Sequence, residues 1–209
     1  MTDLRLFAAM ALLCPLLLAG PAQAAESVRT CRVERVEGTT VRYRQGEDWV
    51  ALAVTALPEG ATRVETGGDT RVEIRCSDGI VVTIGFGTRV DLSHLTGPQD
   101  SRGDVLLDLV DGIIGIVAPE GSWSSFRVRT PLAIASIRST EWLVEHEAGQ
   151  ATAVFVRRGT VAVEAGGTER ALSAGEGVTI AADGQPAAVM NWGQPRIART
   201  AARLGFAWQ

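Results

Sequence analysis

Apolar and polar residues alternate with a period of two along much of the chain, which is the pattern of β-strands with one buried face. The stretch 126–129, with the sequence FRVR, places its apolar residues on one side and its arginines on the other. Pro131 ends this strand, because proline fixes its own φ and holds the preceding residue extended. The apolar run 132–137 is too short for a helix and predicts a buried strand, and a third strand carries Trp142 and Val144 on one face.

Strand patterns of this kind recur from Thr30 onward at intervals of about eight to twelve residues, with glycine or polar turns between them. Many short strands with few helical runs predict an all-β fold. We expect a single domain of mostly antiparallel strands, arranged as a sandwich, a jelly roll or a compact β-roll. Asp-Gly pairs between alternating segments predict hairpins. The two predicted hairpins are Asp78-Gly79, between 71–76 and 80–84, and Asp111-Gly112, between 105–110 and 113–117.

The last stretch of the chain, 189–209, has a helical pattern instead. Its apolar residues fall on one face and Arg196, Arg199 and Arg203 on another, with no acidic residue among 191–209. We predict a short C-terminal helix in a basic amphipathic tail. Two interpretations remain: the helix docks its apolar face on the β core, or the tail binds a partner protein or an anionic component of the cell envelope. The apolar residues are Ile197, Ala201, Leu204 and Trp208.

Residues 1–24 have the pattern of a secretory signal. Arg5 gives a positive n-region, residues 6–18 are apolar, and Ala22-Gln23-Ala24 fits a cleavage site of small residues. This apolar run is shorter than the roughly 20 residues that a bilayer span needs. We therefore expect a cleaved signal peptide, a periplasmic location, no stable membrane span after cleavage, and a β domain over residues 25–188.

Two cysteines would remain after cleavage, Cys31 and Cys76. Export favours disulfides, and the alternation places Cys31 on the face of Val33 and Cys76 on the face of Ile74, so both point inward. We predict a Cys31–Cys76 disulfide, with two buried thiols as the alternative. Neither cysteine has a CxxC neighbour or a nearby histidine, which argues against redox chemistry or a metal site.

The charge and the titratable residues point away from several classes of function. A net charge of −4 gives no basic face for nucleic acid. His94 and His146 have no metal-ligand spacing and no catalytic partner in the sequence, and we expect both at the surface. The acidic residues within 100–111 do not match a calcium loop. We therefore expect no enzyme activity, no cofactor and no metal ion.

The tryptophans divide into two groups by their place in the pattern. Trp49 and Trp142 lie within predicted strands, where we expect them to be buried. Trp123 lies in a loop beside Gly121 and Ser122. An exposed indole there would offer a surface that stacks on a sugar or contacts a partner.

Several short motifs follow one another along residues 30–182. In this order the chain resembles the FecR domain family, which comprises periplasmic domains of iron-citrate-type anti-sigma regulators and many stand-alone exported proteins. The resemblance implies a β domain that works through contacts with other proteins and not through catalysis. The motifs are Trp49-Val50-Ala51-Leu52, Val64-Glu65-Thr66-Gly67, Asp78-Gly79, Leu109-Val110-Asp111-Gly112, Phe126-Arg127-Val128-Arg129-Thr130-Pro131, Ile137-Arg138-Ser139-Thr140-Glu141-Trp142, Arg158-Gly159-Thr160-Val161 and Ala174-Gly175-Glu176.

The chain departs from the membrane-anchored members of this family in three ways. Those members have a cytoplasmic sigma-binding region and a transmembrane helix before the domain, where this chain has the predicted signal. Ser139 stands where the family usually has a glycine, which restricts the backbone of the turn. The receptor-contacting region expected after the domain is replaced by the short tail. We therefore do not carry over the anti-sigma activity from the resemblance.

The residues and the resemblance together predict a non-catalytic periplasmic domain that acts as a binding or sensing partner in cell-envelope signal transduction or regulation. An inner-membrane sensor or an outer-membrane receptor is the expected partner. The alternative is a module that binds an envelope glycan or peptidoglycan. Turns and an exposed strand edge would make the contact. The candidate contact residues are Trp123, Arg138, Ser139, Thr140, Glu141, Arg196, Arg199 and Arg203.

Overall fold

The computed structural model describes residues 28–57, 61–98, 104–119, 125–137 and 140–208. Trp123, Arg138, Ser139 and the signal predicted at 1–24 lie outside these described residues. Strands make up most of the described chain, and one short α-helix lies near its end. The predicted all-β class with a short C-terminal helix is therefore confirmed.

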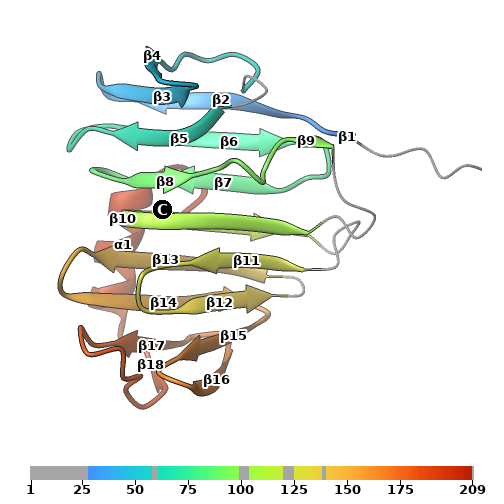
Figure 1. The fold of residues 1–209 in the computed structure, drawn as a ribbon. Helices are drawn as coiled ribbons and strands as arrows, with labels where there is room; N and C mark the ends of the chain where they lie inside the picture. The colour runs from blue at the N-terminus through green and yellow to red at the C-terminus, as the bar shows by residue number, and fades with distance from the viewer. Residues whose placement is uncertain (1–27, 58–60, 99–103, 120–124, 138–139, 209) are drawn as a thin grey trace, which may run out of the picture.

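The strands form two sheets that face each other and share one long strand (Figure 1). Sheet 1 contains, in spatial order, β2 (Cys31–Glu37), β6 (Arg71–Cys76), β7 (Val81–Ile84), the second half of β10 (Val105–Ala118), β13 (Thr140–Glu147), β14 (Ala151–Arg158), β17 (Glu176–Ile180) and β18 (Met190–Asn191). Sheet 2 contains β4 (Asp48–Ala51), β3 (Val41–Gln45), β5 (Ala61–Thr66), β8 (Arg89–Asp91), the first half of β10, β11 (Phe126–Arg129), β12 (Ile134–Ile137), β15 (Thr160–Ala165) and β16 (Thr168–Ser173). These neighbours are antiparallel except for the parallel pair β10–β11, and the short strands β1 (Val28–Arg29) and β9 (Gly97–Pro98) pair separately.

β10 crosses from one sheet to the other, and the direction of its side chains changes at the crossing. Its first half pairs with β8 and β11, and its second half pairs with β7 and β13. Leu107 and Leu109 point into the space between the sheets, and so do Ile114 and Ile116. Inward positions therefore change from odd to even numbers. The change occurs around Gly112, whose φ of 97° lies in the region that favours glycine.

The hairpin predicted at Asp111-Gly112 is therefore wrong. The segments on its two sides do not pair with each other but continue as one strand through the corner. An Asp-Gly pair permits a sharp change of direction, and local sequence does not show whether the chain then folds back or enters a second sheet. The hairpin at Asp78-Gly79 is confirmed, because β6 and β7 are antiparallel and Gly79 has a φ of 87°.

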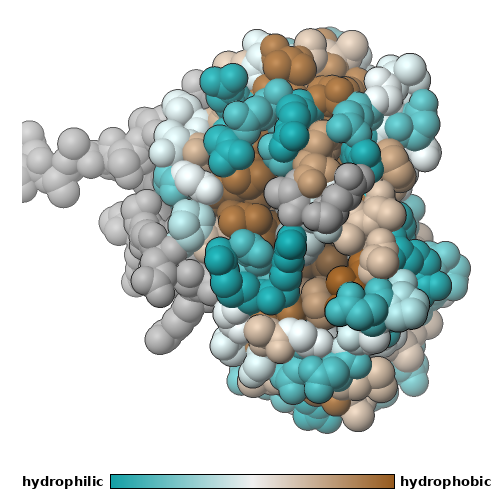
Figure 2. Space-filling model, turned by 180° about the vertical axis from the view of Figure 1, so that it is seen from behind, coloured by the Kyte–Doolittle hydropathy of each residue, from teal (hydrophilic) through white to brown (hydrophobic). Residues whose placement is uncertain are grey.

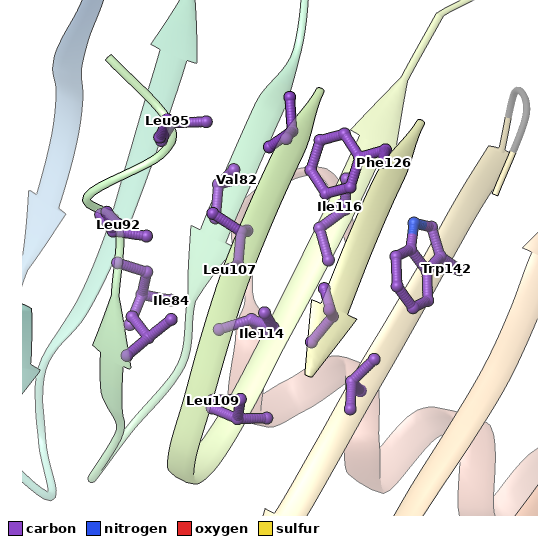
Figure 3. Close-up of a cluster of buried hydrophobic side chains, with 14 of the residues drawn as sticks. Val82, Ile84, Leu92, Leu95, Leu107, Leu109, Ile114, Ile116, Phe126 and Trp142 are labelled. Carbon is purple, nitrogen blue, oxygen red and sulfur yellow. The ribbon is translucent and has the colours of Figure 1, made fainter. Parts of the chain in front are cut away.

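The main apolar core fills the space between the two sheets. Figure 3 shows side chains from both halves of β10 directed into this space beside Phe126 and Trp142. The Phe126 and Trp142 rings meet edge to face, with centroids 6.5 Å apart, and neither side chain is exposed. Burial of one such ring contributes about 2–3 kcal/mol. Trp142 is therefore in the core as predicted, whereas Trp49 lies partly exposed with the Arg42 guanidinium 4.6 Å from its ring centroid.

Threonine hydroxyls connect the successive corners at which the chain passes between the sheets. The Thr70 hydroxyl, between β5 and β6, accepts hydrogen bonds from the backbone N–H groups of Thr39 and Thr40 at 3.0 and 2.9 Å. Thr39 and Thr40 belong to the corner between β2 and β3. Gly38 lets the two corners approach, because a Cβ atom there would lie 2.4 Å from Thr70 Oγ1.

The next two corners are joined in the same way. The Thr66 hydroxyl donates to the carbonyl of Gly85 at 2.7 Å and accepts from the N–H of Thr88 at 2.9 Å. The Thr88 hydroxyl accepts from the N–H of Ile113 at 2.9 Å and donates to its carbonyl at 3.2 Å. A Cβ atom at Gly112 would lie 2.4 Å from Thr88 Oγ1. Thr88 thus fixes the point at which β10 changes sheets.

The C-terminal segment lies on the outer face of sheet 1 (Figure 1). It consists of α1 (Gln194–Leu204) and the 3-10 turn η1 (Phe206–Trp208). Leu204 and Trp208 pack with Leu143 and other apolar residues of sheet 1 in a second cluster. Gly115 leaves room for this contact, since a Cβ atom there would lie 2.5 Å from the Trp208 ring. The tail is therefore docked on the sheet, and no helix within the described ranges is long and apolar enough to cross a bilayer.

Cys31 and Cys76 lie opposite each other on β2 and β6 and form a disulfide in the structure. Their Cα atoms are 4.0 Å apart, and each residue is 5% exposed at the edge of the main core. The bond joins positions separated by 45 residues in sequence. It therefore connects an outer strand of sheet 1 to its neighbour across a long loop.

Replacing both cysteines, Cys31→Ala with Cys76→Ala, should lower the free energy of unfolding by about 3 kcal/mol, because the unfolded chain regains the entropy of an open loop. Urea denaturation measures this difference. A reductant should destabilise the wild type by a similar amount and leave the double variant unchanged. An unfolding midpoint of the wild type that does not respond to reductant would contradict the disulfide.

His146 lies in the interior, contrary to the prediction, whereas His94 is exposed as predicted. His146 is 3% exposed, and its Nδ1 lies 2.9 Å from the hydroxyl oxygen of Thr152, which lies 3.0 Å from that of Thr130. Burial lowers the pKa of His146, and the negative charge of Asp111 partly opposes this effect. His146 has the same even-numbered parity as the buried residues Trp142 and Val144 of β13, so the alternation in the sequence would have predicted its burial.

This buried histidine predicts a pH dependence of stability. Because its pKa in the folded state lies below its ordinary value of 6.5, the unfolded chain binds a proton at a higher pH than the folded chain does. The contribution of neutral His146 to the free energy of unfolding should be complete above about pH 6.5, and it should decrease as the pH falls from there to the lowered pKa of the folded state. Thermal denaturation of the wild type and of His146→Gln across this range isolates the effect. Parallel curves for the two proteins would show that His146 does not cause it.

Candidate functional site

The described residues contain no cluster with the composition of a metal centre. Within them, no group of three or more histidine, cysteine, aspartate and glutamate side chains is placed to hold an ion. The buried histidine is engaged by a threonine hydroxyl and not by a carboxylate. The features that remain for comparison are surfaces that could contact another molecule.

The candidate turn at 138–141 is described only in its second half. Thr140 begins β13 and is 4% exposed, so its side chain is not available at the surface. Glu141 is partly exposed, and its carboxylate oxygens lie 2.8 Å from Arg158 Nη2 and 3.8 Å from Arg157 Nε. Of these two residues, only Glu141 presents a charged group, and that group is already paired.

The structure gathers the three candidate arginines of the tail on one side of α1. Arg196, Arg199 and Arg203 have the i, i+3, i+7 spacing that places side chains on one helix face. Together with Thr200 and with Glu145 of β13 they line a pocket of about 380 Å³. Arg203 forms an ion pair with Glu145 across this pocket. In the view from behind, hydrophilic side chains stand in separate groups with apolar surface between them (Figure 2).

The other two arginines of the pocket differ in their surroundings. Arg196 donates to the Thr179 hydroxyl at 3.1 Å, and its guanidinium lies 3.7 Å from the centroid of the Trp192 ring. Burial lowers the pKa of Arg196, and the positive charge of Arg199 adds to this change while Glu145 opposes it. Arg199 is exposed. The pocket therefore holds two like charges next to each other.

The outer strands of the two sheets differ in what lies beside them. β16 pairs with β15 alone and β4 with β3 alone, so each has an open edge within the described part of the chain. The edge of β2 is covered instead. There the N–H of Val33 donates to the carbonyl of Thr55 at 2.8 Å, and the N–H of Leu57 donates to that of Cys31 at 2.9 Å. Sheet 2 therefore offers two open edges, at its opposite ends.

The open edge of β16 presents backbone groups whose direction follows from the hairpin. Both residues of the Gly166-Gly167 turn have positive φ, as in a two-residue hairpin loop, and Ala165 and Thr168 on its two sides form a hydrogen-bonded pair. From this pair onward, hydrogen-bonded and non-hydrogen-bonded pairs alternate along the hairpin. Ala171, opposite Ala162, falls in a pair of the second kind. Its N–H and carbonyl point to the open edge, where an added strand could bind.

A shallow groove lies next to this hairpin. It has a volume of about 290 Å³ and is lined by residues 129–134 and 164–167. The Thr130 hydroxyl shapes the first wall, because it accepts from the N–H groups of Leu132 and Ala133 at 3.2 and 3.0 Å. Ile134, which is 37% exposed, supplies apolar surface. The Thr130-Pro131 motif therefore builds one side of this groove.

The sequence did not single out either β16 or this groove. The edge position of β16 depends on which strands pair, and alternation along one strand gives no information about its neighbours. The Gly166-Gly167 turn was visible in the sequence and is the one local signal for this hairpin.

Known proteins resemble this chain in sequence and in fold. The family model described as "FecR protein" matches residues 62–162, from β5 into β15. Two crystal structures of a candidate anti-sigma factor from Parabacteroides distasonis, at 2.50 and 1.65 Å resolution, are similar to this chain with a TM-score of 0.56. Each is 19% identical over 66% of this chain, and 62% and 63% of their own lengths are covered.

At this identity the likeness to the crystal structures concerns the fold alone, and the chain spans less than two thirds of the length of those proteins. The comparison with curated proteins gave no match. The family match covers the strand that crosses between the sheets, the Phe126–Pro131 segment and the turn at 158–161. Residues 62–162 of this chain therefore match the model of the FecR family.

Proposed function

We propose that this protein is a non-catalytic regulatory domain that acts in the periplasm by binding another protein of a cell-envelope signalling pathway. The FecR domain supports a regulatory role in signal transduction. The proteins of similar fold are named as candidate anti-sigma factors, which supports the same class of role. The pattern of residues 1–24 supports export. An inner-membrane sensor or an outer-membrane receptor is the partner that fits this location.

The open edge of β16 is the observation that carries the proposal. A partner strand laid beside β16 would extend sheet 2 through backbone hydrogen bonds, and Ala171 would supply one N–H and one carbonyl. The groove beside the Gly166-Gly167 turn would receive a side chain of the partner, with Ile134 as its apolar contact. Backbone pairing would provide affinity, and the groove would provide selectivity.

β16 is a better candidate than β4, the other open edge of sheet 2. β16 has six residues and β4 has four, so β16 offers more backbone groups to an added strand. The side chains of Glu169 and Ala171 are exposed and leave that edge accessible. An accessible edge of this length is the kind that natural proteins usually cover or block, unless it has a use.

A photo-crosslinking residue at position 171 should form a discrete adduct with one periplasmic protein, because this position lies on the proposed edge. The same residue at Ala198, which is exposed on α1, is the matched control and should not form that adduct. Mass spectrometry of the adduct identifies the partner. Equal adducts from both positions, or none from position 171, would contradict the proposed contact.

Ala171→Pro tests the backbone contact itself. Proline removes an N–H that β15 does not use, so the fold should be kept and thermal unfolding should change by only a few degrees. Recovery of the same partner should fall at least about fivefold, since the added strand loses a hydrogen bond and meets the proline ring.

If retention on purified peptidoglycan were found instead, and were lost in Trp123→Ala, the glycan-binding alternative would replace this proposal.

A further inference from the structure

The pocket between α1 and β13 carries an excess of positive charge on a protein that is negative overall. Three guanidinium groups and one carboxylate line it, so its formal charge is about +2, whereas the whole chain has a net charge of −4. Residues 184–209 contain no acidic side chain that could balance the helix. The excess is therefore local to this pocket.

The single carboxylate of the pocket is already in use. Glu145 pairs with Arg203, and neither Arg196 nor Arg199 forms an ion pair among the described residues. Arg196 is partly buried and held in place by the Trp192 ring and the Thr179 hydroxyl. Two guanidinium groups kept side by side, one of them immobilised, repel each other unless an anion lies between them.

The size and spacing of the pocket fit a small oxyanion. Its volume of about 380 Å³ leaves room for such a group. Helix positions three apart have Cβ atoms about 5–6 Å from each other, so Arg196 and Arg199 can reach the same group. Guanidinium groups bind phosphate through paired N–H donors. Thr200 is not free to help, because its hydroxyl donates to the carbonyl of Arg196 at 2.8 Å.

We propose that this pocket binds a phosphate group, with Arg199 and Arg196 as its donors and the Arg203–Glu145 pair as one wall. A terminal phosphate carries a charge of about −1.5 to −2 at neutral pH, which balances the excess charge of the pocket. Free phosphate compounds present such a terminal group, and the headgroup phosphodiester of an anionic phospholipid presents the same kind of oxygen acceptors with one negative charge. The proposal does not depend on the open edge of β16, which lies in sheet 2, whereas α1 covers sheet 1.

Isothermal titration of the full chain with inorganic phosphate at about 0.15 M salt tests the site directly. Arg199→Ala should weaken binding about tenfold or more, because it removes a charge-assisted donor. The phosphate affinity of Arg199→Lys should lie between those of the wild type and Arg199→Ala, since lysine keeps the charge and loses the paired N–H donors. Arg32→Ala is the matched control: Arg32 is exposed on β2, at the far end of sheet 1, and its removal should change binding less than about twofold.

A second arm identifies the source of the phosphate group. Sedimentation with vesicles of phosphatidylcholine, with and without phosphatidylglycerol, measures binding to a headgroup. Binding to free phosphate that depends on Arg199 supports the proposal with a free phosphate compound as ligand. Binding only to the anionic vesicles, again dependent on Arg199, supports it with a lipid headgroup. Absence of both, or equal losses in Arg199→Ala and Arg32→Ala, would overturn the proposal.

Discussion

The hydrogen bonds of Thr88 to both backbone groups of Ile113 are the interaction on which the arrangement of the two sheets depends. A strand that leaves one sheet and enters another must bend, and its backbone groups at the bend lose their ladder partners. Buried N–H and carbonyl groups need replacements. At the corner of β10, the Thr88 hydroxyl accepts from the N–H of Ile113 and is a second donor to the Ile113 carbonyl, which also accepts from the N–H of Gly85 at 2.9 Å; Gly112 permits the close approach. At the neighbouring corners, the Thr66 hydroxyl bonds the carbonyl of Gly85 and the N–H of Thr88, and the Thr70 hydroxyl accepts from two backbone N–H groups.

This construction also decides where the protein can make contacts. Because the chain passes repeatedly between the sheets, most described strands have neighbours on both sides, and the open edges of sheet 2 lie at its two ends, on β4 and β16. The C-terminal helix covers the outer face of sheet 1 and brings its own charged side chains to that face. The edge of β16 and the arginine pocket are therefore separate surfaces, built on different sheets. Binding of a protein at the proposed edge and of an anion in the proposed pocket would therefore be independent of each other.

The local part of this structure could be predicted from the sequence, and the long-range part could not. Alternation located the strands, Asp78-Gly79 marked a true hairpin, and helical spacing marked α1. Asp111-Gly112 has the same local signature as a hairpin, but the partner of each half of β10 is a distant strand, which no local pattern encodes. The edge position of β16 could not be predicted either, because it depends on which distant strands pair. Trp49 was misplaced because an aromatic ring in a strand also suits a surface where an arginine covers it.

The most direct test of this account compares Thr88→Val with Thr83→Val by urea denaturation. Both threonines are 1% exposed, but Thr83 Oγ1 has no hydrogen-bond partner among the described residues. Replacing Thr88 leaves the buried N–H of Ile113 unpaired and should lower the free energy of unfolding by about 2–3 kcal/mol. Replacing Thr83 removes a hydroxyl that bonds to nothing and should leave stability unchanged or raise it. Equal, small effects of the two substitutions would contradict the claim that the threonine at this corner holds β10 between the sheets.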